Sequence, residues 1–189
     1  MKPLLATFSL LLAAARAAAG SDAADLQEVM RLLAAHRHGR VDFVEQHFMP
    51  VLKRPVESYG VMTYQAPDRL EKRTVEPVPE TLVADGNVLS IERKGHTHVI
   101  ELSVHPSLLP FIESLRATLG GDLGALEQVF KVDFSGTVAR WTLDLVPRDA
   151  RVAKIATHVR IEGAGDELLR VEILAADGSR SLTTLRQSP

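Results

Sequence analysis

Residues 82–91 read Leu-Val-Ala-Asp-Gly-Asn-Val-Leu-Ser-Ile, which is two short apolar stretches joined by Asp85, Gly86 and Asn87. Asp-Gly between apolar stretches is a strong short-range signal for a β-hairpin, because both residues tolerate the backbone angles of a tight turn. After the turn, Leu89 and Ile91 are two residues apart, so a strand places them on one face. The stretch therefore predicts a hairpin with one apolar face.

The same period-two pattern continues on both sides of this hairpin, over residues 40–104. Turn chemistry interrupts it about every eight to twelve residues, which is typical of antiparallel strands in sequence order. The breaks fall at residues 53–55, 66–68, 77–79, 85–87 and 94–95. Four prolines, Pro55, Pro67, Pro77 and Pro79, lie at these breaks, where no hydrogen bond of a strand ladder is lost. We expect a meander of about six strands.

The C-terminal part of the chain predicts about five more strands, within residues 130–134, 138–145, 154–161, 167–174 and 180–185. The tightest turns are expected at Ser135-Gly136 and Asp177-Gly178. Helical spacing marks three other segments: residues 25–37, residues 107–119 with Ser107 as a cap, and a short helix over 122–128 capped by Asp122. Gly120 and Gly121 end the second of these helices.

About eleven antiparallel strands suit a strongly curled sheet better than a flat one. The predicted fold class is mainly β with α, an incomplete antiparallel β-barrel with a helical lid over an apolar cavity. We expect the lid to present Leu108, Phe111, Ile112, Leu115 and Leu119. The candidate residues of the cavity wall are Phe43, Met62, Tyr64, Leu70, Leu89, Ile91, Ile100, Leu102, Trp141 and Leu143. The aromatic and methionine positions among them also fit an ordinary core. A one-residue error in register would reverse the face of any of them.

The N-terminus has the layout of a secretory signal peptide: Lys2, an apolar stretch over residues 4–15, and then small residues. Cleavage after Ala17 or after Ala19 fits the small-residue rule equally well. We expect residues 1–19 to be a cleaved signal and residues 20–189 to be a single domain in the periplasm. The apolar stretch is shorter than the roughly 20 residues that a membrane span needs.

Charge and cysteine content narrow the function classes further. Removal of residues 1–19 takes away Lys2 and Arg16 and no acid, so the formal net charge falls from −2 to −4. An acidic domain argues against nucleic acid or an anionic membrane surface as the main partner. The chain has no cysteine, so neither a disulfide nor a lipid-modified cysteine is available.

Catalytic and metal-binding patterns are weak. The sequence has no Gly-x-Ser-x-Gly elbow, no His-Glu-x-x-His and no glycine-rich phosphate loop, so we expect neither an enzyme nor a cofactor. His96 and His98 share a strand face, with His105 nearby, but a closed metal site needs three or four ligands. A solvated strand end is the simpler interpretation, and no metal site is predicted.

In order along the chain, several segments carry a family resemblance: Phe43-Val44-Glu45, Ser58 to Tyr64 followed by Pro67-Asp68-Arg69-Leu70, Pro77, the turn at 82–86, residues 141–147, and Asp177-Gly178-Ser179. The chain resembles the periplasmic outer-membrane lipoprotein carrier proteins, the LolA-like group, over essentially the whole mature domain. The resemblance implies an incomplete barrel with a helical lid, and a monomer that shields the acyl chains of a lipoprotein, or a related lipid, on the way to the outer membrane. Burial gains about 0.8 kcal/mol per methylene, which suits such a carrier.

The implied partners are an inner-membrane donor and an outer-membrane acceptor or exporter. The chain departs from the family pattern at two places. Gln65 and Ala66 stand where typical carriers have a basic residue that holds the lid shut, and Glu45 and Gln46 replace the early glutamine. The lid is therefore expected to be held mainly by apolar contacts. A divergent branch that carries another lipid stays open. The alternative is an envelope sensor or accessory module of the same fold, which recognises lipid and acts through a membrane protein.

Overall fold

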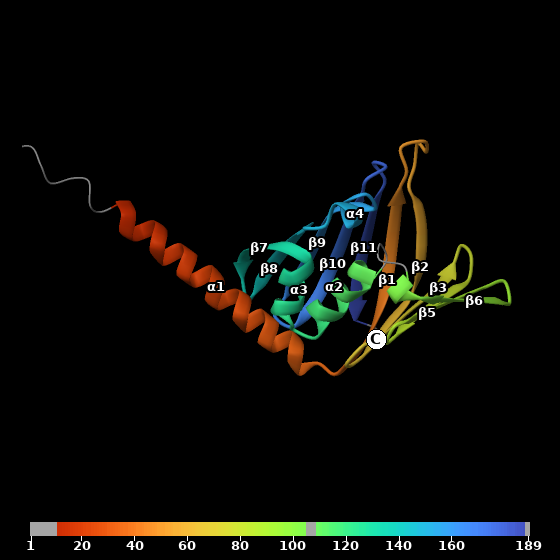
Figure 1. Cartoon of the computed structure of the whole chain (residues 1–189), viewed down its shortest axis with the longest axis horizontal. Coiled ribbons are helices and arrows are strands. Elements are labelled where there is room, and N and C mark those ends of the chain that lie inside the picture. Colours follow the sequence, from red (N-terminus) through yellow and green to blue (C-terminus); the bar gives the residue numbers. More distant parts are fainter. Residues whose placement is uncertain (1–10, 105–108, 188–189) are drawn as a thin grey trace, which may run out of the picture.

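The computed structural model of the chain describes residues 11–104 and 109–187, and Figure 1 shows their arrangement. Six strands follow the first helix, α1 (Leu11–Ala35). They are β1 (His38–Phe48), β2 (Val56–Gln65), β3 (Arg69–Glu76), β4 (Glu80–Asp85), β5 (Val88–Arg93) and β6 (His96–Glu101). The predicted meander of six strands is confirmed, and all five predicted breaks lie between strands.

A short 3-10 helix, η1 (Leu102–Val104), is followed by two helices, α2 (Leu109–Leu119) and α3 (Leu123–Val129). The second half of the sheet then comprises β7 (Phe130–Thr137), β8 (Arg140–Pro147), β9 (Ala156–Ala164), β10 (Glu167–Ala175) and β11 (Arg180–Gln187), with the short α4 (Ala150–Ala153) between β8 and β9. The side chain of Asp122 accepts a hydrogen bond from the Ala125 backbone N–H and caps α3, as predicted.

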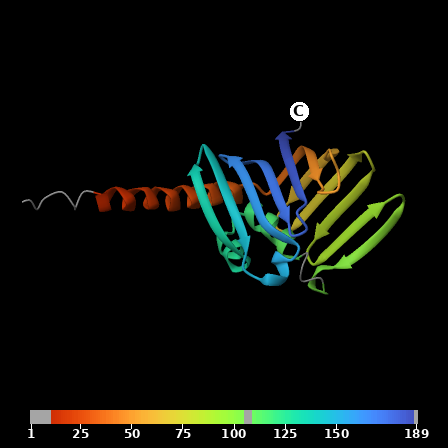
Figure 2. The ribbon, with the colours of Figure 1, turned by 90° about the horizontal axis from the view of Figure 1, so that it is seen from above.

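All eleven strands form one antiparallel sheet in the order β6-β5-β4-β3-β2-β1-β11-β10-β9-β8-β7. Strand β1 pairs with β2 on one side and with β11 on the other, so the first and last strands of the chain join the two halves. The sheet is open, with β6 and β7 at its edges, and it is not a closed barrel. Figure 2 shows its curvature from above. The predicted incomplete antiparallel barrel is confirmed in this open form.

Three local predictions need correction. First, α1 begins at Leu11 and not near residue 25. Second, α4 was not predicted, because four residues are too few to show helical periodicity. Third, Ser135 and Gly136 lie inside β7, and the chain reverses at residues 138–139. Gly136 has a φ of 105°, and a Cβ there would lie 2.3 Å from the Arg140 carbonyl oxygen. This glycine allows a close approach within the ladder, not a turn.

Among the described residues, the main hydrophobic cluster lies under one half of the sheet. Helix α1 contributes Val29, Met30 and Leu33, and α3 contributes Leu126, to a cluster with the inner faces of β7, β8 and β9. Trp141 is the largest of its side chains, and its indole N–H donates to the Gly165 carbonyl at 3.0 Å. Gly163 provides room for this ring, because a Cβ there would lie 2.1 Å from it. The half built from β1 to β5 lacks such a filling.

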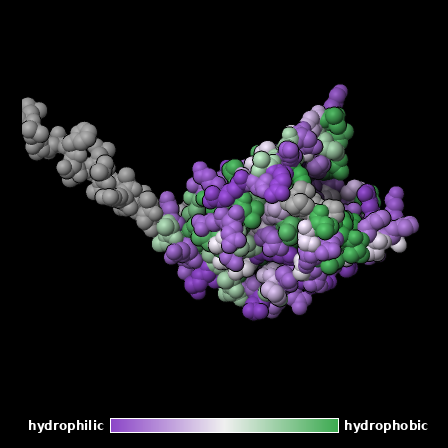
Figure 3. Space-filling model, in the orientation of Figure 1, coloured by the Kyte–Doolittle hydropathy of each residue, from purple (hydrophilic) through white to green (hydrophobic). Residues whose placement is uncertain are grey.

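The tip of the β1–β2 hairpin projects from the surface and carries exposed apolar residues. Figure 3 shows apolar residues along this projection, where Val51 is 89% exposed and Leu52 is 46% exposed. Among the described residues, no helix has the length and apolar character that crossing a membrane requires.

Candidate functional site

An apolar cavity of about 480 Å³ lies between α2 and the curved inner face of the sheet. Residues of seven strands form its wall, and α2 forms its roof. The apolar residues of α2 recur at helical spacing, so they lie on one face of the helix, and this face is turned toward the sheet. The apolar lining residues are Val41, Met62, Tyr64, Leu70, Leu82, Ala84, Leu89, Phe111, Ile112, Leu115, Leu119, Leu168 and Leu185. The volume is within the range of small-molecule sites.

Four of the ten predicted cavity residues line this space: Met62, Tyr64, Leu70 and Leu89. Strand register brings three of them together, since Tyr64 pairs with Leu70, Leu70 with Ala84 and Ala84 with Leu89 across four strands. Of the predicted lid residues, Phe111, Ile112, Leu115 and Leu119 also line the cavity. Leu108 lies outside the described residues.

The other predicted cavity residues lie elsewhere. Trp141 and Leu143 belong to the core cluster under α1 and α3. Phe43 is buried on β1 and Leu102 is buried in η1, and neither lines the cavity. Ile91 and Ile100 share a sheet face with Leu89 by register but lie outside the lining. Alternation along a strand assigns a face, but it does not say which part of that face a helix fills.

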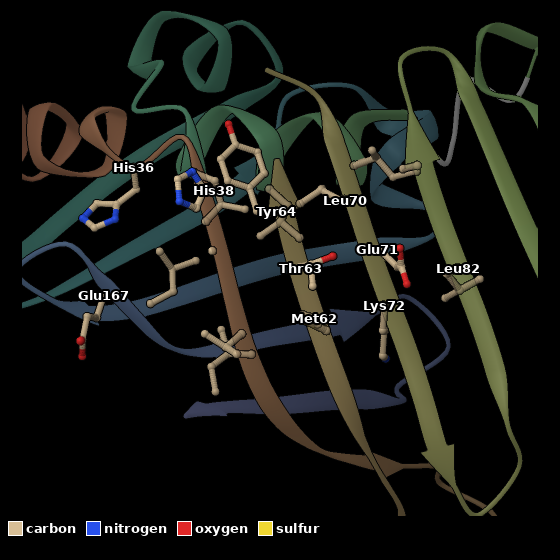
Figure 4. A pocket seen from close by; sticks show the side chains of 18 of the residues that line it. His36, His38, Met62, Thr63, Tyr64, Leu70, Glu71, Lys72, Leu82 and Glu167 are labelled. Carbon is tan, nitrogen blue, oxygen red and sulfur yellow. The ribbon is translucent and has the colours of Figure 1, made fainter. Parts of the chain in front are cut away.

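One end of the cavity is polar and open to solvent. His36, at the end of α1, pairs through Nε2 with the Asp166 carboxylate in the β9–β10 turn, and both side chains are about half exposed. This hydrogen bond from His36 lowers the pKa of Asp166. His38, Glu167 and Gln187 complete the rim. Figure 4 shows His36 and Glu167 on one side of the pocket and Lys72 and Leu82 on the opposite side.

At the opposite end, Lys72 donates to Glu45 with an Nζ–Oε2 distance of 2.5 Å. Three hydroxyls also donate to this carboxylate: Ser181 at 2.7 Å, and Ser58 and Thr183 at 3.4 Å each. Burial by itself raises the pKa of Glu45, but the charge of Lys72 and the donated hydrogen bonds outweigh burial, so the pKa is below its usual value. No local sequence pattern indicates this group, since its five residues come from four strands.

Gln65 and Ala66 occupy the position at which typical carriers have the basic residue that holds the lid shut. Gln65 is exposed and lies beside Arg37 and Arg69, away from α2. The cation near this turn comes from α2 itself: Arg116 is 93% buried and donates through Nη1 to Glu113 at 2.8 Å. Its Nε and Nη2 have no hydrogen-bond partner among the described residues. Burial raises the pKa of nearby Tyr64, and the positive charges of Arg37 and Arg116 act in the opposite direction.

The histidines of the β5–β6 hairpin do not form a metal centre with other described residues. His96 and His98 are exposed on the edge strand, and His105 lies outside the described residues. Within residues 11–104 and 109–187, no group of three or more His, Cys, Asp or Glu side chains could hold a metal ion.

An open, curved sheet with an apolar cavity under a helix defines a class of binding protein that holds apolar ligands. A family model described as outer membrane lipoprotein carrier protein LolA-like matches residues 17–188. The chain therefore belongs to the LolA-like family of outer membrane lipoprotein carrier proteins. It is a family of carrier and binding proteins, not of enzymes.

A curated relative is an outer-membrane lipoprotein carrier protein from Alkalilimnicola ehrlichii, to which the chain is 33% identical over 132 residues. The match covers 69% of this chain and 56% of the relative, so the chain spans about half the length of that protein. Among solved structures, a LolA superfamily protein from Nitrosomonas europaea is 13% identical with a TM-score of 0.45, over 89% of this chain and 95% of that one. The Mycobacterium tuberculosis lipoprotein LppX is 14% identical with a TM-score of 0.46, over 88% and 95%. These two similarities carry no functional argument.

Proposed function

We propose that the protein is a periplasmic carrier that shields the acyl chains of a lipoprotein, or of a related lipid, in the cavity under α2. The observation that supports this proposal is the cavity itself, whose wall and roof carry thirteen apolar residues. Each buried methylene contributes about 0.8 kcal/mol, so a chain can be held firmly without any covalent step. Family membership supports the same function.

The direct test is binding of an apolar fluorescent probe. Leu115→Asp places a charge in the roof of the cavity, and we expect it to weaken probe binding about tenfold or more, because an unpaired charge in an apolar site is costly. The matched control is Val99→Asp on the edge strand β6, where Val99 is 69% exposed and does not line the cavity. Equal binding by both folded variants and the wild type would contradict the proposal.

A second experiment separates the carrier from a lipid sensor that acts through a protein partner. We propose a monomer that receives cargo from an inner-membrane donor and delivers it to an outer-membrane acceptor or exporter. Protein purified from its native envelope should then contain extractable lipid or lipoprotein. A stoichiometric membrane protein, recovered without lipid in the cavity, would instead support the sensor.

A further inference from the structure

The cavity has two chemically different ends, and this difference bears on the length of the acyl chains that it accepts. At the end marked by His36, Asp166 and Glu167 the lining residues are exposed. At the other end Met62 and Lys72 are only partly exposed, and Figure 4 shows Lys72 opposite His36. The exposed end is the mouth, and the Lys72 end is the floor.

The floor coincides with a row of the sheet. Val41 pairs with Met62, and Met62 pairs with Lys72, so on β1, β2 and β3 these three residues form the last row that lines the cavity. On β11, Leu185 also lines the cavity, and it pairs with Phe43 in the row that follows. The next row on the same face holds Phe43 and Gly60, which pair with each other. The Phe43 ring fills the space above Gly60, where a Cβ would lie 2.8 Å from the ring. The Lys72 ammonium lies 4.9 Å from the centroid of the same ring.

Beyond this row lies the Glu45 carboxylate, which accepts from Lys72 and from three hydroxyls on β2 and β11. An apolar chain that advanced past Lys72 would separate this ion pair or displace hydrogen-bond donors from a partly buried carboxylate. Both changes leave a charged group without compensation in a poorly solvated place, which is more costly than burial of another methylene is favourable.

We propose that Phe43, Lys72 and Glu45 form a polar stop that limits the length of the acyl chain the cavity accepts. The ligand is an unbranched acyl chain that inserts its methyl end first and leaves its polar head at the His36–Asp166 mouth. Chain length is then measured from the mouth to Lys72. The inference rests on the proposed function, because it requires that acyl chains bind in this cavity.

The test is displacement of the fluorescent probe by unbranched fatty acids from octanoic to stearic acid. For the wild type we expect affinity to rise about fourfold per methylene up to a limiting length and then to stop rising. Lys72→Ala opens the floor, so the limiting length should move to longer acids by at least two carbons. The double variant Glu45→Gln/Lys72→Ala also opens the floor but leaves no unpaired carboxylate. It replaces the single variant in this test if the single variant does not fold. Val41→Phe fills the last lining row and should shift the limit to shorter acids.

Lys131→Ala is the matched control, because Lys131 is an exposed residue of β7 outside the cavity, and it should leave the limiting length unchanged. If no acid displaces the probe and none binds, the proposed function fails together with the stop. If the acids bind but wild-type affinity rises without a limit, or both Lys72 variants keep the limiting length of the wild type, the stop alone is overturned.

Discussion

At the scale of single residues, Glu45 couples the stability of the sheet to pH. Its pKa is lower in the folded protein than in a free side chain, for which it is about 4.3. A lowered folded-state pKa contributes stability that is fully present above the unfolded value and is lost as pH falls through the folded value. We expect the free energy of unfolding of the wild type to fall more steeply below about pH 4.3 than that of Glu45→Gln. Urea unfolding at a series of pH values measures this, and parallel profiles would contradict it.

Arg116 is the second residue with an unusual environment. Its guanidinium is buried, while its partner Glu113 is about half exposed on the same helix face. Removal of one partner of a buried charge leaves the other uncompensated, whereas removal of the buried charge itself does not. Glu113→Gln should therefore destabilise by about 1–3 kcal/mol, and Arg116→Met should cost less or stabilise. Thermal unfolding compares the two variants directly. A larger loss in Arg116→Met would show that its guanidinium makes a favourable interaction that its contacts do not reveal.

At the scale of elements, the turn between α2 and α3 fixes how the helices sit on the core. Gly121 has a φ of 65°, and a Cβ there would lie 2.0 Å from the Met30 carbonyl oxygen of α1. Gly165 has a similar φ of 57°, with nothing within 4 Å of such a Cβ. Gly165→Ala should cost about 1 kcal/mol of backbone strain, and Gly121→Ala more than about 3 kcal/mol, because the clash with α1 adds to the strain. Chemical denaturation measures both, and equal losses would mean that α1 yields to the new methyl group.

Most elements could be predicted from the sequence, because alternation and turn residues act over a few positions. The turns at 85–87 and 94–95, the cap at Asp122 and the stripe of α2 are local patterns of this kind. Gly136 was misjudged since glycine marks both turns and close backbone approaches, and only the pairing with β8 distinguishes them. The N-terminal extent of α1 was not predicted, because residues 11–19 consist of leucine, alanine and one arginine and show no alternation of apolar and polar faces.

At the scale of the whole molecule, the cavity could be predicted in kind but only partly in residues. Tyr64 and Trp141 both point to the inner face of the same sheet, yet α1 and α3 fill the space beside Trp141 and only α2 covers the space beside Tyr64. That difference depends on how three helices are distributed over eleven strands, which no local pattern contains. The Glu45 group is hidden for the same reason, since Ser181 and Thr183 are more than 130 positions away in sequence.

Only the C-terminal part of α1 is seen to pack on the core, and this bears on removal of the signal peptide during export. Leu26, Val29, Met30 and Leu33 of the helix pack on the core, and its N-terminal part extends away from the sheet (Figure 1). Cleavage near Ala18 or Gly20 would therefore leave all four of these core residues in the mature protein. We expect mass spectrometry of the protein from the periplasm to find a mature N-terminus at one of these positions. Purified residues 20–189 should unfold at the same temperature as the full chain, because stability depends on buried contacts that both share. Recovery of a form that begins at Met1 from the periplasm would contradict cleavage, and a clearly lower unfolding temperature would show that the removed segment contributes to the fold.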